Sequence, residues 1–225
     1  MFDIVGDVHG CDDELAALLA LLGHPTEPDR RHPAGRRLVF VGDLVDRGPA
    51  TPAVLRRVMA LVACGSALCV AGNHDVRLAD ALRGLPVEPG HGLEESLGQL
   101  AGEPASFRDA VVAFIDGLPA HLVLDDGRLV VAHAGLEEAH HGSDSREGRE
   151  QAVHGAYTGE FDDRPMPVRD DWAARYAGAA VVVQGHTPVA EAEWFRGTIC
   201  IDTVCVYGGR LTALSWPERR LVAVP

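Results

Sequence analysis

The 225-residue sequence is 47% hydrophobic and has a formal net charge of −13. Its length and hydrophobic content suffice for one well-packed core, whereas so acidic a chain disfavours a long nucleic-acid track. Lysine is absent, which excludes a P-loop lysine, a Schiff base and a Ser–Lys catalytic pair.

The N-terminus carries no basic segment followed by an apolar one, and no early run of about 18 apolar residues occurs, so we expect neither a secretory signal nor a membrane span. The 5 cysteines are an odd number without a C-x-x-C pair, which favours a reducing cytoplasm. Since no repeat or low-complexity tract divides the chain, we expect a single domain over 1–225.

Strands and helices alternate in the first part of the chain, which predicts parallel pairing in an α/β fold. Each expected strand is a short β-branched or apolar run, and each helix has its apolar residues on one face. The expected elements are strand Phe2–Val5, a helix carrying Leu15, Leu18, Leu19 and Leu22, strand Leu38–Val41, a helix opened by Thr51 as N-cap and closed by Gly65, strand Ala67–Ala71 and a helix from about Val76.

The second part reads differently. A helix around Phe107–Ile115 precedes a hairpin that turns at Asp126-Gly127, and residues 137–179 form a polar, loop-rich insert that we expect to shape the substrate mouth. Short β-like runs then follow from Val181 to Val224. A two-sheet α/β core with outer helices suits both halves.

Five apolar strands end in polar residues. The endings are Gly6-Asp7-Val8-His9, Gly42-Asp43, Gly72-Asn73-His74, His133-Ala134-Gly135 and Gly185-His186. Because ligands bind beyond the carboxyl ends of strands in α/β sheets, these endings can converge on one point. Oxygen and imidazole donors without thiolate suit manganese, iron, zinc or cobalt.

The motifs G-D-V-H-G, G-D-L-V-D-R-G-P, G-N-H-D, H-A-G and G-H-T, in this order, resemble those of the calcineurin-like metallophosphoesterases, and in particular the phosphoprotein-phosphatase branch. The resemblance extends from residue 6 to residue 187. It implies a four-layer αββα fold, two packed mixed sheets flanked by helices, with two divalent metal ions at the strand ends. Manganese is the first expectation, with iron, zinc, cobalt or nickel as alternatives.

The C-terminal part narrows the resemblance. I-D-T at Ile201–Thr203, followed by Tyr207-Gly208-Gly209, is similar to bacterial bis(5'-nucleosyl)-tetraphosphatase-like phosphatases and to the phosphatase module of bacterial polynucleotide kinase–phosphatases. Val204 stands where the resemblance to that subgroup leads us to expect glycine. A Cβ at this position would change the backbone near the site and thereby the fine geometry of substrate binding.

The resemblance implies roles for particular residues. Asp7 and His9 would hold one metal, Asn73, His133 and His186 the other, and Asp43 would bridge them. His74 would act as general acid supported by Asp46, and Arg47 would bind phosphate oxygens. Arg169 and Asp202 are further candidates for substrate binding. The implied reaction is phosphate-ester hydrolysis by a metal-bridging hydroxide.

The expected substrates are small phosphorylated molecules: nucleotides, nucleic-acid ends or dinucleoside polyphosphates. A protein serine/threonine phosphatase is the alternative that the core motifs also permit. An inactive metal-binding scaffold is a third reading, although every implied ligand position is filled.

Overall fold

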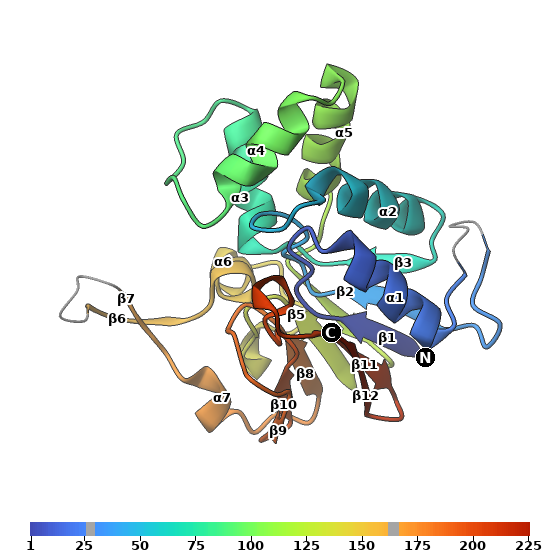
Figure 1. The fold of residues 1–225 in the computed structure, drawn as a ribbon. Helices are drawn as coiled ribbons and strands as arrows, with labels where there is room; N and C mark the ends of the chain where they lie inside the picture. Colours follow the sequence, from blue (N-terminus) through green and yellow to red (C-terminus); the bar gives the residue numbers. More distant parts are fainter. Residues whose placement is uncertain (26–29, 162–166) are drawn as a thin grey trace.

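The computed structural model describes residues 1–25, 30–161 and 167–225 (Figure 1). Its first sheet consists of β1 (Phe2–Val5), β2 (Arg37–Phe40), β3 (Ala67–Cys69), β11 (Leu211–Trp216) and β12 (Arg220–Val224), in the order β12-β11-β1-β2-β3. Its second sheet consists of β4 (His121–Leu124), β5 (Leu129–Ala132), β8 (Val181–Gln184), β9 (Trp194–Phe195) and β10 (Thr198–Cys200), in the order β4-β5-β8-β10-β9. Each sheet mixes parallel and antiparallel pairs.

Strands β1, β2 and β3 are parallel to one another, and so are β5, β8 and β10. The carboxyl ends of each set therefore lie at one edge of its sheet. The antiparallel partners β11 and β12 extend the first sheet, and the hairpin of β4 and β5 turns as expected.

The apolar strands separate two cores because successive side chains of a strand point to opposite faces. Ile4, Val39 and Val41 pack against residues of the second sheet, including Val131 and Val183. Their neighbours Val5, Leu38 and Phe40 belong to the core on the other face, which the helices cover. The near-continuous apolar runs of the sequence reflect burial on both faces.

Helices cover both outer faces. On the first sheet pack α1 (Asp12–Leu22) and α2 (Thr51–Ala63), and beside them lie α3 (Asn73–Leu82), α4 (Leu93–Ala101) and α5 (Ala105–Asp116). On the second sheet, Trp172 of α7 (Trp172–Arg175) and the adjacent Tyr176 cover Val130 and Val182. This arrangement confirms the predicted four-layer fold.

The insert 137–179 contains more structure than its composition suggested. It forms η1 (Glu138–His140), α6 (Arg146–His154) and the two-stranded ribbon of β6 (Tyr157–Phe161) and β7 (Pro167–Arg169), which extends away from the sheets in Figure 1. Among the described residues, no helix is long and apolar enough to cross a membrane.

Two predicted boundaries were wrong, and one helix was not predicted. Helix α3 begins at Asn73 rather than near Val76, because the Asp75 carboxylate accepts the Gly72 N–H at 3.1 Å and caps the helix earlier. Thr51 is the first residue of α2, and its N-cap is Ala50. Helix α4 was not predicted, since the Pro/Gly loop before it hides its start.

Candidate metal centre

The six predicted metal ligands converge at the carboxyl ends of the central strands. Asp7 and His9 follow β1, and Asp43 follows β2. Asn73 opens α3 just after β3, and His133 and His186 follow β5 and β8 of the second sheet. The site therefore lies where the two sheets meet, as the strand endings predicted.

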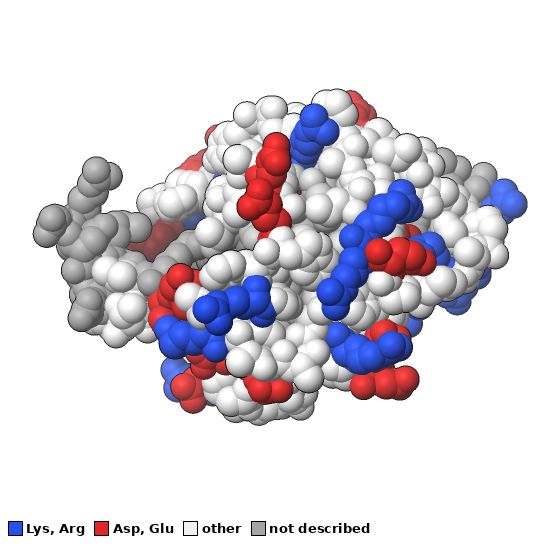
Figure 2. All heavy atoms as spheres, turned by 90° about the horizontal axis from the view of Figure 1, so that it is seen from below, with Lys and Arg blue, Asp and Glu red and all other residues white. Residues whose placement is uncertain are grey.

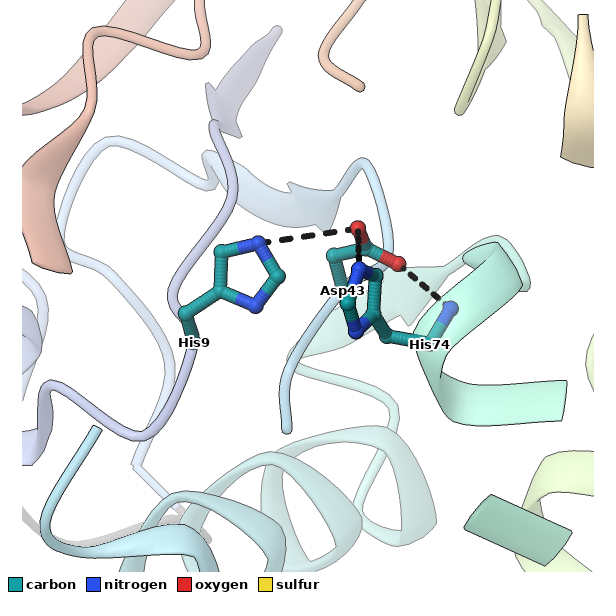
Figure 3. Close-up of side chains that lie close together, drawn as sticks. All are labelled: His9, Asp43 and His74. Carbon is teal, nitrogen blue, oxygen red and sulfur yellow. Dashed lines mark hydrogen bonds and ion pairs between the residues drawn. The ribbon is translucent and has the colours of Figure 1, made fainter. Parts of the chain in front are cut away.

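Asp43 lies at the middle of the cluster. Its Oδ2 is 3.6 Å from His9 Nε2, 3.3 Å from His133 Nε2 and 4.0 Å from His74 Nε2. Figure 3 shows the rings of His9 and His74 both directed at this carboxylate. The groups Asp43, His9, His74 and Asp43, Asp7, His133 each have their donor atoms within 4.8 Å of one another. Asp43 alone belongs to both.

Asn73 joins the donors that come from the second sheet. Its Oδ1 lies 2.9 Å from His133 Nε2 and 2.9 Å from His186 Nδ1. The two ring nitrogens are themselves 3.2 Å apart, and the His186 backbone N–H donates to Asp7 Oδ2 at 3.0 Å. Asp7 and His186 are thus held together across the two sheets.

Backbone carbonyls fix which nitrogen of two histidines is free to bind a cation. His9 Nδ1 lies 2.7 Å from the Val45 carbonyl oxygen, and His133 Nδ1 lies 3.0 Å from the Val41 carbonyl oxygen. A carbonyl only accepts hydrogen bonds, so both Nδ1 atoms carry the proton. In both residues Nε2 then faces Asp43, and a ring held through Nδ1 with Nε2 toward the cation is the usual arrangement of metal-ligating histidines.

A buried oxygen lacks a partner at the point where a cation fits. Asp7 Oδ1 is buried and makes no hydrogen bond in the described part of the chain, although a buried carboxylate oxygen ordinarily requires one. The Cβ of any residue replacing Gly185 would lie 1.8 Å from this atom. Glycine therefore permits the close approach, and the residues present fit a divalent cation.

The loops that carry the site adopt uncommon backbone conformations. Five of the predicted site residues have positive φ, namely His9 (43°), Asp43 (49°), Asp46 (71°), Arg47 (71°) and His186 (67°). Non-glycine residues rarely adopt this region, and such strain concentrates at functional sites. The strained loops aim these side chains toward the centre.

The electrostatics of the cluster are those of crowded, desolvated groups. Burial, with the nearby negative charge of Asp202, raises the pKa of Asp7 well above its usual range. Burial alone would raise the pKa of Asp43 too, but the charges of His133, His74 and His9 hold it well below its usual range. Burial lowers the pKa of His9 to about 4. A divalent cation would favour the anionic carboxylates and the neutral imidazoles.

His74 and Asp46 form the predicted pair. His74 Nδ1 lies 2.6 Å from Asp46 Oδ2, and the Arg47 guanidinium lies 2.9 Å from His74 Nε2 and 2.5 Å from His9 Nε2. Arg47 therefore faces the centre rather than pairing with Asp46. Its guanidinium also lies 5.7 Å from the ring centroid of Tyr207.

Arg77 is a site residue that the sequence analysis missed. Its guanidinium donates to Asp46 Oδ2 at 2.8 Å and lies 3.2 Å from His74 Nδ1. The signal was its position three residues after His74, which places both on one face of a helix. The expected helix began near Val76, so His74 was not predicted to share a helix with Arg77.

The structure describes one of the two predicted substrate-side residues. Asp202 is buried, with 6% of its surface exposed, and its Oδ1 accepts the Val204 N–H at 3.1 Å. Burial raises its pKa. Arg169 ends β7, and its side chain lies outside the described residues.

The two-sheet fold and its clustered carboxylate, amide and imidazole donors define a metallophosphoesterase. The family model described as calcineurin-like phosphoesterase matches residues 1–216. The chain belongs to this family, whose members are dimetal-dependent phosphoesterases, and the resemblance inferred from its motifs is confirmed.

Similar proteins cover nearly the whole chain. Bis(5'-nucleosyl)-tetraphosphatase PrpE [asymmetrical] of Anoxybacillus flavithermus is 42% identical over 230 aligned positions, which cover 100% of this chain and 94% of the relative. The protein of that name from Bacillus subtilis is 41% identical and covers 100% and 94%. A solved structure of a "putative diadenosine tetraphosphatase" has a TM-score of 0.71, 28% identity and coverage of 100% and 92%.

A yeast protein serine/threonine phosphatase structure has a TM-score of 0.65 at 13% identity, with coverage of 99% of this chain and 78% of that one. At this identity the likeness concerns the fold alone.

Proposed function

We propose that this phosphoesterase hydrolyses dinucleoside polyphosphates, with a divalent metal pair held by Asp43 and its neighbours. The observation that carries the proposal is the sharing of Asp43 between two buried donor groups. The relatives named as bis(5'-nucleosyl)-tetraphosphatases support the choice of substrate. A cytoplasmic location and manganese as the bound metal remain predictions from the cysteine count and the donor types.

We assign the donors as the family resemblance implies, which differs from the two observed groups, where Asp7 lies with His133 and His74 lies with His9. Asp7, His9 and Asp43 would hold one cation, and Asn73, His133 and His186 would hold the second together with Asp43. Bound there, the cations supply positive charge to the phosphoryl oxygens and activate water.

The chain's own residues provide binding and proton transfer. Arg47, which already faces His9 and His74, would donate its planar N–H groups to phosphate oxygens. His74 would give its proton to the leaving-group oxygen, and Asp46 would orient the ring through Nδ1. Arg77 would hold the Asp46 carboxylate in place through its hydrogen bond to Oδ2. Asp202 is buried, and its charge acts on Asp7. It would help to position the residues around Asp7 rather than touch the phosphate.

One face of the molecule carries no continuous basic track among its described residues (Figure 2). On the face seen in Figure 2, the arginines form short groups with acidic side chains beside them. Such a face offers little to a long polynucleotide backbone, which requires many phosphate contacts.

A substrate panel tests the proposal. Protein loaded with Mn²⁺ is incubated with diadenosine tetraphosphate, a 3′-phosphorylated oligonucleotide, a 2′,3′-cyclic nucleotide and a phosphopeptide, and kcat/KM is measured for each. We expect diadenosine tetraphosphate to have the highest value, with Asp43→Asn inactive and the exposed-site control Asp109→Asn unchanged. A preference for the phosphopeptide would replace the proposal with a protein phosphatase, and full metal loading without turnover would indicate an inactive scaffold.

A further inference from the structure

A cavity beside the metal centre lies in the insert rather than over the predicted metal ligands. It measures about 790 Å³ and is lined by the end of η1, by one face of α6 and by the segment from Gly155 to Tyr157, where β6 begins. This volume falls within the range of small-molecule sites. The reaction at phosphorus does not by itself require such a cavity.

Gly155 connects the cavity to the metal centre. It lines the cavity, and a Cβ at this position would lie 3.9 Å from His186 Nε2 and 3.7 Å from the Ala134 Cβ. Ala134 directly follows His133. A ligand that touches Gly155 is therefore separated from His186, one of the proposed metal ligands, by the width of one glycine.

The wall of the cavity offers an aromatic ring. Tyr157 lines the cavity at the start of β6, and 46% of its surface is exposed. Large exposed aromatic side chains are few in this protein. An accessible ring beside a phosphoesterase centre suits a nucleobase, because every base can stack on an aromatic face.

The floor of the cavity is polar and not fully satisfied. Gln151 of α6 lines the cavity with only 7% of its surface exposed. Its Nε2 has no hydrogen-bond partner within the residues that the structure describes. Such a group calls for a further partner, and a hydrogen-bonding ligand in the cavity would provide one.

The charges around the cavity suit an uncharged nucleoside better than phosphates, because one lining arginine faces four lining carboxylates, Glu137, Glu147, Glu150 and Asp170. Arg175 forms ion pairs with the lining carboxylates of Glu137 and Asp170, which lowers their net charge. Arg146 also lines the cavity, and its guanidinium can donate to a phosphate oxygen of the ligand. The lining carboxylate of Glu150 can accept hydrogen bonds from ribose hydroxyls.

We infer that this cavity binds one nucleoside of a dinucleoside polyphosphate, with the base on Tyr157 and the phosphate chain passing Gly155 toward the metal centre. The inference rests on the proposed function and deepens it. It assigns substrate selection to the insert 137–179 and names Tyr157 as a specificity-determining residue.

The test compares a dinucleotide with a substrate too small to reach the cavity. For wild type, Tyr157→Ala and Tyr157→Phe, kcat/KM is measured with diadenosine tetraphosphate and with p-nitrophenyl phosphate. Because stacking on one aromatic ring contributes strongly to base binding, the ratio of the two values should fall about 10-fold in Tyr157→Ala. It should return to the wild-type ratio in Tyr157→Phe. The control Phe195→Ala removes another exposed aromatic, at the edge strand β9, and should leave the ratio unchanged.

Calorimetric titration with adenosine provides a second reading that requires no turnover. Adenosine carries no phosphate, so its binding reports the cavity alone, and Tyr157→Ala should weaken it about 10-fold. An unchanged ratio, or adenosine binding that Tyr157→Ala leaves intact, would overturn the inference while the phosphoesterase activity stood. Failure of wild type to hydrolyse diadenosine tetraphosphate would overturn the proposed function, and the adenosine titration would still decide the nature of the cavity.

Discussion

Substitutions at Val204 test whether the backbone beside Asp202 is strained. Val204 has φ 56° and ψ 39°, which is the left-handed region that β-branched residues avoid. A residue with a Cβ loses about 1–2 kcal/mol there, and glycine escapes this cost. Glycine lowers the free energy of unfolding by about 0.5–1 kcal/mol relative to alanine, because the unfolded chain has more conformational freedom at glycine. The difference predicts that Val204→Gly is more stable than Val204→Ala by about 0.5–1 kcal/mol.

Urea unfolding of the two metal-loaded variants, compared at equal m-values, measures this difference. Ala110→Gly, at an exposed position of α5, is the control of opposite sign and should lose about 1 kcal/mol. The reasoning fails if Val204→Ala proves as stable as Val204→Gly while the control behaves as expected. Equal stability of the two variants would also mean that the cost of a Cβ at positive φ does not explain why glycine is expected at position 204.

Three further predictions concern the site and the core. His74→Ala should lower kcat roughly 10²–10⁴-fold in steady-state assays while elemental analysis finds the metal content unchanged. Gly185→Ala should displace Asp7, because the new Cβ would lie 1.8 Å from Asp7 Oδ1, and metal affinity should fall about 10–100-fold. Burial alone would raise the pKa of Asp3, but hydrogen bonds from three side chains hold it below its usual range. Its stabilising effect is thus present above the unfolded pKa of about 3.9 and is lost as pH falls through the folded pKa. Asp3→Asn should cost about 3 kcal/mol at pH 7, and the gap to wild type in urea unfolding should narrow below about pH 4.

Each of these has a result that would count against it. Undiminished turnover in His74→Ala would remove its role as general acid. Tight metal binding by Gly185→Ala would show that Asp7 is not needed where the structure holds it. A stability gap between wild type and Asp3→Asn that stays constant down to about pH 2 would contradict the lowered pKa of this carboxyl.

The sequence predicted the residues that cluster at this centre because their signal is local. Asp7, Asp43 and His133 each come within three residues of a buried strand, and glycines stand beside the first two. The direction of parallel strands then brings such endings to one edge. The two sheets and most of their strands followed from the same apolar runs.

The contacts that hold the His74–Asp46 pair in place could not be predicted from local sequence patterns. Asp46 receives the Arg77 guanidinium from α3, and its backbone N–H donates to Ser96 Oγ of α4 at 2.8 Å. Both contacts depend on tertiary packing of helices whose starts the sequence obscured. The left-handed backbone at Arg47 is likewise imposed by the folded loop, since arginine rarely adopts it.

The metal content of the purified protein is the most direct test of the central claim. Wild type is dialysed with Mn²⁺, freed of excess metal and analysed for bound ions per chain, beside Asp43→Asn and the control Asp109→Asn. We expect about two ions per chain in wild type and in the control, and at most about one in Asp43→Asn because both donor groups share this carboxylate. Wild type without stoichiometric metal, or Asp43→Asn that retains both ions, would contradict the account.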